Sequence, residues 1–70
     1  VGYKMKWYEY RDRKTGELVW WTQRDKLGNC FEIRELLFSR RLRLFVNEVA
    51  KKDYDTLIEA QRAARAEWVD

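Results

Sequence analysis

The chain has 70 residues, of which 46% are hydrophobic and 16% aromatic. This length predicts a single small domain over 1–70, close to the lower size limit for folding without disulfides or metals. The hydrophobic content excludes an intrinsically disordered chain, although 39% of the residues are charged. Fifteen Lys and Arg against twelve Asp and Glu give a formal net charge of +3, which is less one-sided than in proteins that coat DNA.

Several residue types that common chemistries need are missing. The chain has no His and a single cysteine, Cys30, which excludes an internal disulfide and the usual structural zinc sites. Without His there is no ordinary general base at neutral pH, and Cys30 has no residue to activate it. We therefore expect Cys30 to be buried and inert, and the protein to be non-enzymatic with no cofactor and no metal.

The sequence also bears on the cellular compartment. It has no apolar run of about 18 residues and no apolar segment of the kind found in signal peptides. We expect a protein that does not enter the membrane and that works in the reducing cytoplasm, because its one cysteine has no partner.

The first third of the chain predicts a β-hairpin. Residues 3–11 and 17–23 alternate and are rich in aromatic side chains, as strands are. The polar segment between them ends at Gly16, which is typical of a hairpin loop with a bulge or a longer turn. Cross-strand aromatic pairs would stabilise this hairpin by about 0.2–1 kcal/mol each, and the candidates are Trp7 or Tyr8 with Trp20 or Trp21.

Residues 30–49 fit two structures. Read as strands over 30–37 and 41–47, their alternation turns Leu42, Leu44 and Val46 inward. Read as helix, Asn29 and Glu32 form a capping box at its start. We prefer strands because they build a sheet that a helix can cover, whereas a lone hairpin is marginal. Two details are less regular: segment 38–40 lacks the Gly, Asn or Asp of a good turn, and we expect 51–53 to be a solvated connector.

The end of the chain predicts a helix. Thr56 and Glu59 have the spacing of a capping box, in which the Thr hydroxyl accepts the Glu59 N–H and the carboxylate reaches back to the Thr56 N–H. Small alanines on one helical stripe let the helix lie close to a sheet, with larger side chains at both ends. The residues of this stripe are Leu57, Ala60, Ala64 and Trp68. The fold class is therefore α+β: an antiparallel sheet of three or four strands covered on one face by the C-terminal helix. The alternative is a hairpin followed by two helices.

The segment 54–64, YDTLIEAQRAA, resembles the aromatic-x-Thr-Leu-x-Glu-Ala-x-x-Ala signature that closes many small bacterial and phage open reading frames. It is also similar to the helix of AP2-like and integrase arm-type DNA-binding modules. In those modules a three-stranded sheet precedes such a helix and reads DNA. The resemblance implies a small accessory protein of phage or mobile-element type that binds nucleic acid.

Basic residues on the predicted strands are compatible with that function. Guanidinium groups grip phosphates, and Arg41 and Arg43 share a strand face with Phe45, which could stack on a base. The partner would be the backbone of DNA or RNA. The candidate contacts are Lys4, Lys6, Arg11, Arg13, Arg41 and Arg43.

The aromatic residues suggest a different function. A core this small does not easily bury four Trp, four Tyr and three Phe, and exposed aromatics ringed by charge are typical binding hot spots. Tyr8, Tyr10 and Trp21 are the candidates. In this interpretation the protein binds another protein, for example as a phage-encoded inhibitor of a host protein. A homodimer is compatible with either function.

Overall fold

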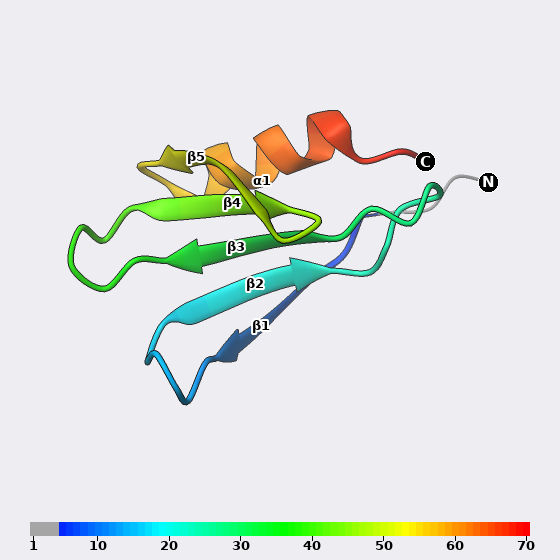
Figure 1. The fold of residues 1–70 in the computed structure, drawn as a ribbon. Coiled ribbons are helices and arrows are strands. Elements are labelled where there is room, and N and C mark those ends of the chain that lie inside the picture. The colour runs from blue at the N-terminus through cyan, green and yellow to red at the C-terminus, as the bar shows by residue number, and fades with distance from the viewer. Residues whose placement is uncertain (1–4) are drawn as a thin grey trace.

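The computed structural model describes residues 5–70, which form five strands followed by one helix (Figure 1). Each strand pairs antiparallel with its neighbour in sequence, so the sheet is a simple meander in the order β1-β2-β3-β4-β5. The predicted α+β class is confirmed, and the alternative with two helices is wrong. The sheet has one strand more than the three or four predicted. The elements are β1 Trp7–Arg11, β2 Leu18–Thr22, β3 Phe31–Glu35, β4 Leu42–Val46, β5 Val49–Tyr54 and α1 Leu57–Glu67.

The additional strand is β5, which includes the segment 51–53 that we expected to be a connector. It begins directly after a two-residue turn in which Asn47 and Glu48 both have positive φ, 51° and 68°. Such turns match the twist of paired strands, but they favour Asn followed by Gly. Because Glu48 stands where glycine is usual, the sequence did not indicate a turn at this position. The register of β4 and β5 shifts by one residue, since Leu44 pairs with Lys52 and Phe45 with Ala50.

The β1–β2 and β3–β4 loops share one geometry. In the β1–β2 loop the Gly16 N–H donates to the Asp12 carbonyl at 2.7 Å. In the β3–β4 loop the Arg40 N–H donates to the Leu36 carbonyl at 2.8 Å. Gly16 and Arg40 hold the same position and both have positive φ, 79° and 60°. Segment 38–40 forms a turn without Gly, Asn or Asp because Arg40 itself takes the left-handed conformation, which glycine would adopt at no cost.

Helix α1 begins at the predicted cap. The Thr56 hydroxyl accepts the Glu59 N–H at 3.2 Å, and that hydroxyl donates to the Glu59 carboxylate at 3.1 Å. The carboxylate thus binds the Thr56 side chain instead of the Thr56 N–H. Ala60 and Ala64 are fully buried, and Trp68 is buried as the residue that caps the C-terminal end. The predicted stripe is therefore the face that packs on the sheet.

The main core lies between α1 and one face of β3, β4 and β5, the strands that the helix contacts. In Figure 1, α1 runs along the β4–β5 side, while the β1–β2 hairpin curls away from it. The predicted inward face of β4 is confirmed. The strand residues buried in this core are Phe31, Ile33, Leu42, Leu44 and Val46.

A buried carboxylate ties the β2–β3 loop to the chain's C-terminal tail. Asp25 accepts hydrogen bonds from the N–H groups of Leu27, Asn29 and Val69 and from the Asn29 side-chain amide, at 2.8–3.0 Å. The Lys26 N–H donates back to the Val69 carbonyl at 3.0 Å. Burial opposes ionisation of Asp25, but these donors outweigh it and lower its pKa. We call this set of contacts the Asp25 clasp.

Within the described residues, no helix has the length and apolar character needed to cross a membrane.

Candidate functional site

Among residues 5–70, no helix lies over the face of the sheet opposite α1. We call it the open face. Strand register places its side chains in two rows that each cross all five strands. The first row is Tyr8, Trp21, Glu32, Phe45 and Ala50, and the second is Tyr10, Val19, Arg34, Arg43 and Asp53.

The aromatic residues proposed from the sequence gather on this face. Tyr8, Tyr10 and Trp21 keep 37%, 43% and 40% of their surface exposed. The rings of Tyr8 and Trp21 stack with centroids 4.7 Å apart, which confirms the predicted cross-strand pair. The Lys6 ammonium lies 5.4 Å from the centroid of Tyr8, within the range of a cation–π contact. The open face therefore offers aromatic surface to solvent and already holds one cation against a ring.

Val19 gives the open face a small packed layer of its own. Its side chain is fully buried although it lies on the side of the sheet away from α1. Its neighbours in the row are Tyr10 and Arg34. The neighbouring side chains of this face therefore pack around a buried residue, which limits the conformations that they can adopt.

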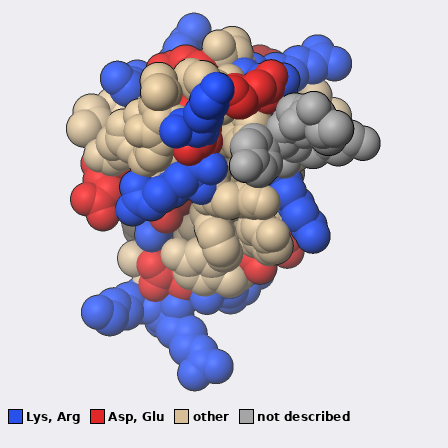
Figure 2. Space-filling view, turned by 90° about the vertical axis from the view of Figure 1, so that its right-hand side faces the viewer, with Lys and Arg blue, Asp and Glu red and all other residues tan. Residues whose placement is uncertain are grey.

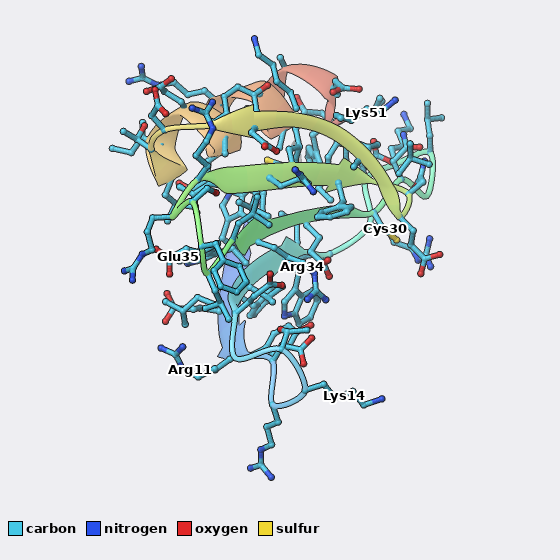
Figure 3. All side chains as sticks on the ribbon, turned by 60° about the vertical axis from the view of Figure 1, so that its left-hand side comes forward. Arg11, Lys14, Cys30, Arg34, Glu35 and Lys51 are labelled. Carbon is cyan, nitrogen blue, oxygen red and sulfur yellow. The ribbon has the colours of Figure 1, made fainter. Side chains whose placement is uncertain are left out.

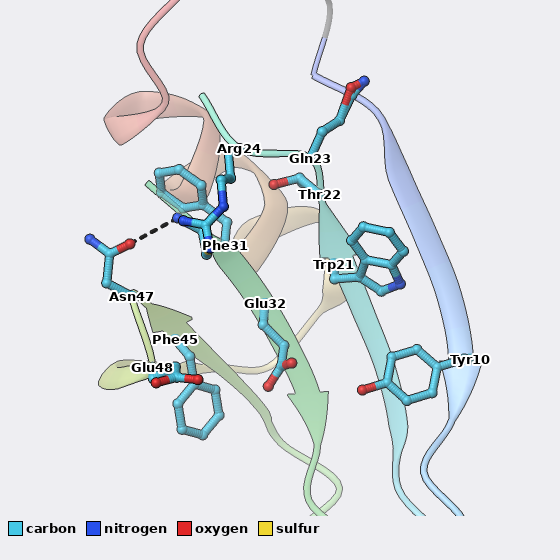
Figure 4. A pocket seen from close by; sticks show the side chains of 11 residues that line it. Tyr10, Trp21, Thr22, Gln23, Arg24, Phe31, Glu32, Phe45, Asn47 and Glu48 are labelled. Atoms are coloured by element: carbon cyan, nitrogen blue, oxygen red, sulfur yellow. Dashed lines mark hydrogen bonds between the residues drawn. The ribbon is translucent and has the colours of Figure 1, made fainter. Parts of the chain in front are cut away.

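A groove of about 760 Å³ crosses this face. Trp21 and Tyr10 line one side, Phe45 and Glu48 line the other, and Glu32 lies between them (Figure 4). Together these side chains make a groove with aromatic sides and a carboxylate in its floor.

The upper end of the groove is formed by polar groups. Asn47 accepts the Cys30 N–H at 2.9 Å through its side-chain oxygen. Arg24 donates to the Gly28 carbonyl at 2.8 Å. Cys30 is partly exposed and lines the groove, so the expectation that it would be buried is wrong. Cys30 directly precedes β3, beside the turn that contains Asn47. It therefore lies outside the core, in which its neighbour Phe31 is buried.

Arg34 is the centre of an ionic cluster in the second row. Its guanidinium lies 2.7 Å from Glu32, 3.0 Å from Asp12 and 3.3 Å from Glu17. Burial opposes the charge of Arg34, but hydrogen bonds from its guanidinium to Glu32 and Asp12 raise its pKa. The bond from Arg34 likewise lowers the pKa of Asp12. One guanidinium shared by three carboxylates leaves this cluster with an excess of negative charge.

Two of the arginines proposed as phosphate contacts are already paired. Arg43 binds both oxygens of Asp53, at 2.7 and 3.1 Å, which raises the pKa of Arg43 and lowers that of Asp53. Arg41 lies 2.8 Å from Asp55 and also donates to the Asp53 carbonyl at 3.3 Å. Both guanidinium groups would have to give up these bonds to reach a phosphate.

The other proposed basic contacts do not converge. Arg11 lies on the opposite side of β1 from Tyr8 and Tyr10 and donates to the Gly16 carbonyl at 2.8 Å. Arg13 is exposed in the β1–β2 loop, and Lys4 lies outside the described residues. Figure 3 shows Arg11 and Lys14 at the hairpin end, far from Lys51 at the other edge of the sheet. On the side seen in Figure 2, basic and acidic side chains are interleaved and no continuous basic surface forms.

The lining of the groove is acidic, although the whole chain has a formal charge of +3. It includes the carboxylates of Glu32 and Glu48 and one cationic side chain, Arg24. This local excess of negative charge is unfavourable for a phosphate backbone and favourable for a basic ligand.

Sequence reasoning named Phe45 only as a residue that could stack on a base, and it did not assign Glu32 to a site. Their alternation with Ile33 and Leu44 was visible, but their meeting depends on the β3–β4 register. In residues 5–70, no group of Cys, Asp and Glu is arranged to hold a metal ion. No family model, curated protein or solved structure matches this chain.

Proposed function

We propose that this protein is a non-enzymatic protein-binding module that docks its partner on the open face. The observation that carries the proposal is the gathering of Tyr8, Tyr10 and Trp21 on a sheet face that no other element of the described chain covers. Tyrosine and tryptophan are enriched among the residues that dominate binding energy at protein interfaces. They add large contact area and lose little side-chain freedom on binding.

Charge supports this choice over nucleic-acid binding. Arg41 and Arg43 are held by Asp55 and Asp53, and the groove is lined by two carboxylates, Glu32 and Glu48, but only one cation, Arg24. A phosphate backbone whose bases stacked on Trp21 and Phe45 would be repelled by the carboxylate of Glu32, which lies between them. A protein partner with a basic surface meets no such repulsion.

Affinity capture tests the proposal. The immobilised protein is incubated with nuclease-treated bacterial lysate, and captured proteins are quantified for the wild type and for variants. We expect Trp21→Ala to weaken partner binding by about 2 kcal/mol, which is about 30-fold. The matched control is Ile58→Ala, which removes an exposed apolar side chain from α1, away from the open face, and should leave capture unchanged.

A parallel experiment addresses the competing function. Arg41→Ala combined with Arg43→Ala should leave protein capture intact, and the wild type should not shift mixed-sequence DNA or RNA in gels at tens of micromolar protein. Non-specific nucleic-acid binders usually bind in that range at physiological salt. A gel shift that the double arginine variant removes, with capture that Trp21→Ala does not change, would reject the protein-binding function in favour of nucleic-acid binding.

A further inference from the structure

Building on the proposed function, we propose that the groove of the open face binds an arginine side chain of the partner protein. Its guanidinium would lie between Trp21 and Phe45 and pair with the carboxylate of Glu32. The chemistry of the three groups carries the inference: two aromatic faces and an anion are the elements of cation–π and ion-pair recognition of a planar cation.

The spacing of the groove suits a single side chain. Trp21 and Phe45 lie in one row on β2 and β4, with only Glu32 of β3 between them. Strands lie about 4.8 Å apart, so the two aromatic residues are separated by roughly 10 Å at the backbone. A cation held midway would be within about 6 Å of both rings, the distance over which cation–π attraction is significant.

Glu32 has an oxygen available for such a ligand. Its Oε2 accepts from Nε of Arg34 at 2.7 Å, whereas Oε1 has no hydrogen-bond donor among residues 5–70. Arg34 therefore fixes the carboxylate in place and leaves its second oxygen free. Figure 4 shows the Glu32 carboxylate between Phe45 and Tyr10, facing the groove.

The surrounding charge favours a cation over an anion in this groove. Arg34 is shared with Asp12 and Glu17 as well as Glu32, and Glu48 adds another carboxylate at the side of the groove. Arg24 is the one cation among the lining residues, and it is turned to the Gly28 carbonyl. Tyr8, which lies in the same row as Trp21, already has the Lys6 ammonium against its ring, so an aromatic ring of this face accommodates a cation.

An NMR titration tests the site with small probes. The ¹⁵N-labelled protein is titrated with N-acetyl-arginine methylamide and, separately, with the citrulline analogue, which has nearly the same shape but no charge. We expect the arginine probe to shift the Trp21 indole resonance saturably, with millimolar affinity, and the citrulline probe to bind at least tenfold more weakly. Equal binding of both probes, or no saturable shift at Trp21 up to about 100 mM, would overturn the proposal.

Variants separate the roles of charge and ring. Glu32→Gln should weaken the arginine probe about tenfold, while Glu67→Gln, at the far end of α1, should have no effect. Because Glu32 also pairs with Arg34, Phe45→Leu provides a second variant that keeps the ion pair, and it should weaken the probe as well. Melting curves show whether each variant is folded. If both variants fold and bind the probe like the wild type, the site is wrong.

The outcomes also distinguish this inference from the function on which it rests. If Trp21→Ala abolishes capture of a protein partner but Glu32→Gln does not change it, the partner uses the open face without an arginine in the groove. If the arginine probe binds as described but no protein is captured in a manner that depends on Trp21, the arginine site in the groove is supported and the proposed function is wrong.

Discussion

The loop between β3 and β4 provides a quantitative test of the fold, because Arg40 takes the backbone conformation that Gly16 takes in the loop between β1 and β2. We expect Arg40→Gly to stabilise the protein. A non-glycine residue in the left-handed region destabilises the folded protein by about 1–2 kcal/mol. Glycine removes this strain, but it lowers the free energy of unfolding by about 0.5–1 kcal/mol because the unfolded chain becomes more flexible. The difference is a gain of about 0.5–1 kcal/mol.

The substitution also removes an ion pair, but that loss is small. Arg40 lies 3.7 Å from Glu35, and its side chain is 74% exposed, so the pair is worth at most a few tenths of a kcal/mol. For a domain of this size, the net gain corresponds to a melting temperature that is about 2–8 °C higher. The assay is thermal unfolding followed by circular dichroism at fixed pH and salt.

The matched control is Arg40→Ala, which removes the same ion pair and keeps the backbone strain. The reciprocal change, Gly16→Ala, should destabilise the protein through strain alone, since the nearest atom to an added methyl group is a Leu37 methyl carbon at 3.8 Å. If Arg40→Gly melts no higher than Arg40→Ala, the left-handed conformation of Arg40 does not carry the cost assigned to it.

Three further predictions concern the helix and its attachment. Ala64→Leu should lower the free energy of unfolding by about 1–3 kcal/mol by overpacking the fully buried contact with the sheet, and an unchanged urea midpoint would mean that another face of α1 packs there. Thr56→Ala should cost about 0.5–2 kcal/mol through loss of the cap, while Thr56→Ser should restore most of it. Because the pKa of Asp25 is lower in the folded protein, its stabilising effect is present above the unfolded value of about 3.9 and is lost as the pH falls through the folded pKa. Asp25→Asn should therefore be less stable at pH 7 and lose less stability between pH 7 and pH 3 than the wild type; equal losses in urea titrations at the two pH values would contradict this.

Local sequence rules were sufficient for most of the architecture. Alternation correctly assigned the inward face of β4, and the spacing of Ala60 and Ala64 correctly assigned the buried face of α1. Both patterns are periodic over several residues, so they report on burial directly. The rules failed at β5, because Glu48 adopts a left-handed conformation that its residue type rarely takes. Without that turn, the lysines of 51–52 indicated a connector.

The candidate site was harder to predict because it depends on pairing between strands. The aromatic character of Tyr8, Tyr10 and Trp21 was evident, but only the register brings them to one face. The charge of Arg43 suggested a free cation, whereas its cross-strand partner is Asp53. Composition counts charges, but only three-dimensional pairing tells which of them are available to a ligand.

The Asp25 clasp has a consequence for the order in which the protein folds. Every strand pairs with its neighbour in sequence, so each hairpin can close over a short loop, which is entropically cheap. The bond from Val69 to Asp25 joins residues 44 positions apart and requires both the β2–β3 loop and the docked helix. We expect amide exchange at Val69 to become slow only when the whole domain is assembled, which makes this one amide a reporter of completed folding.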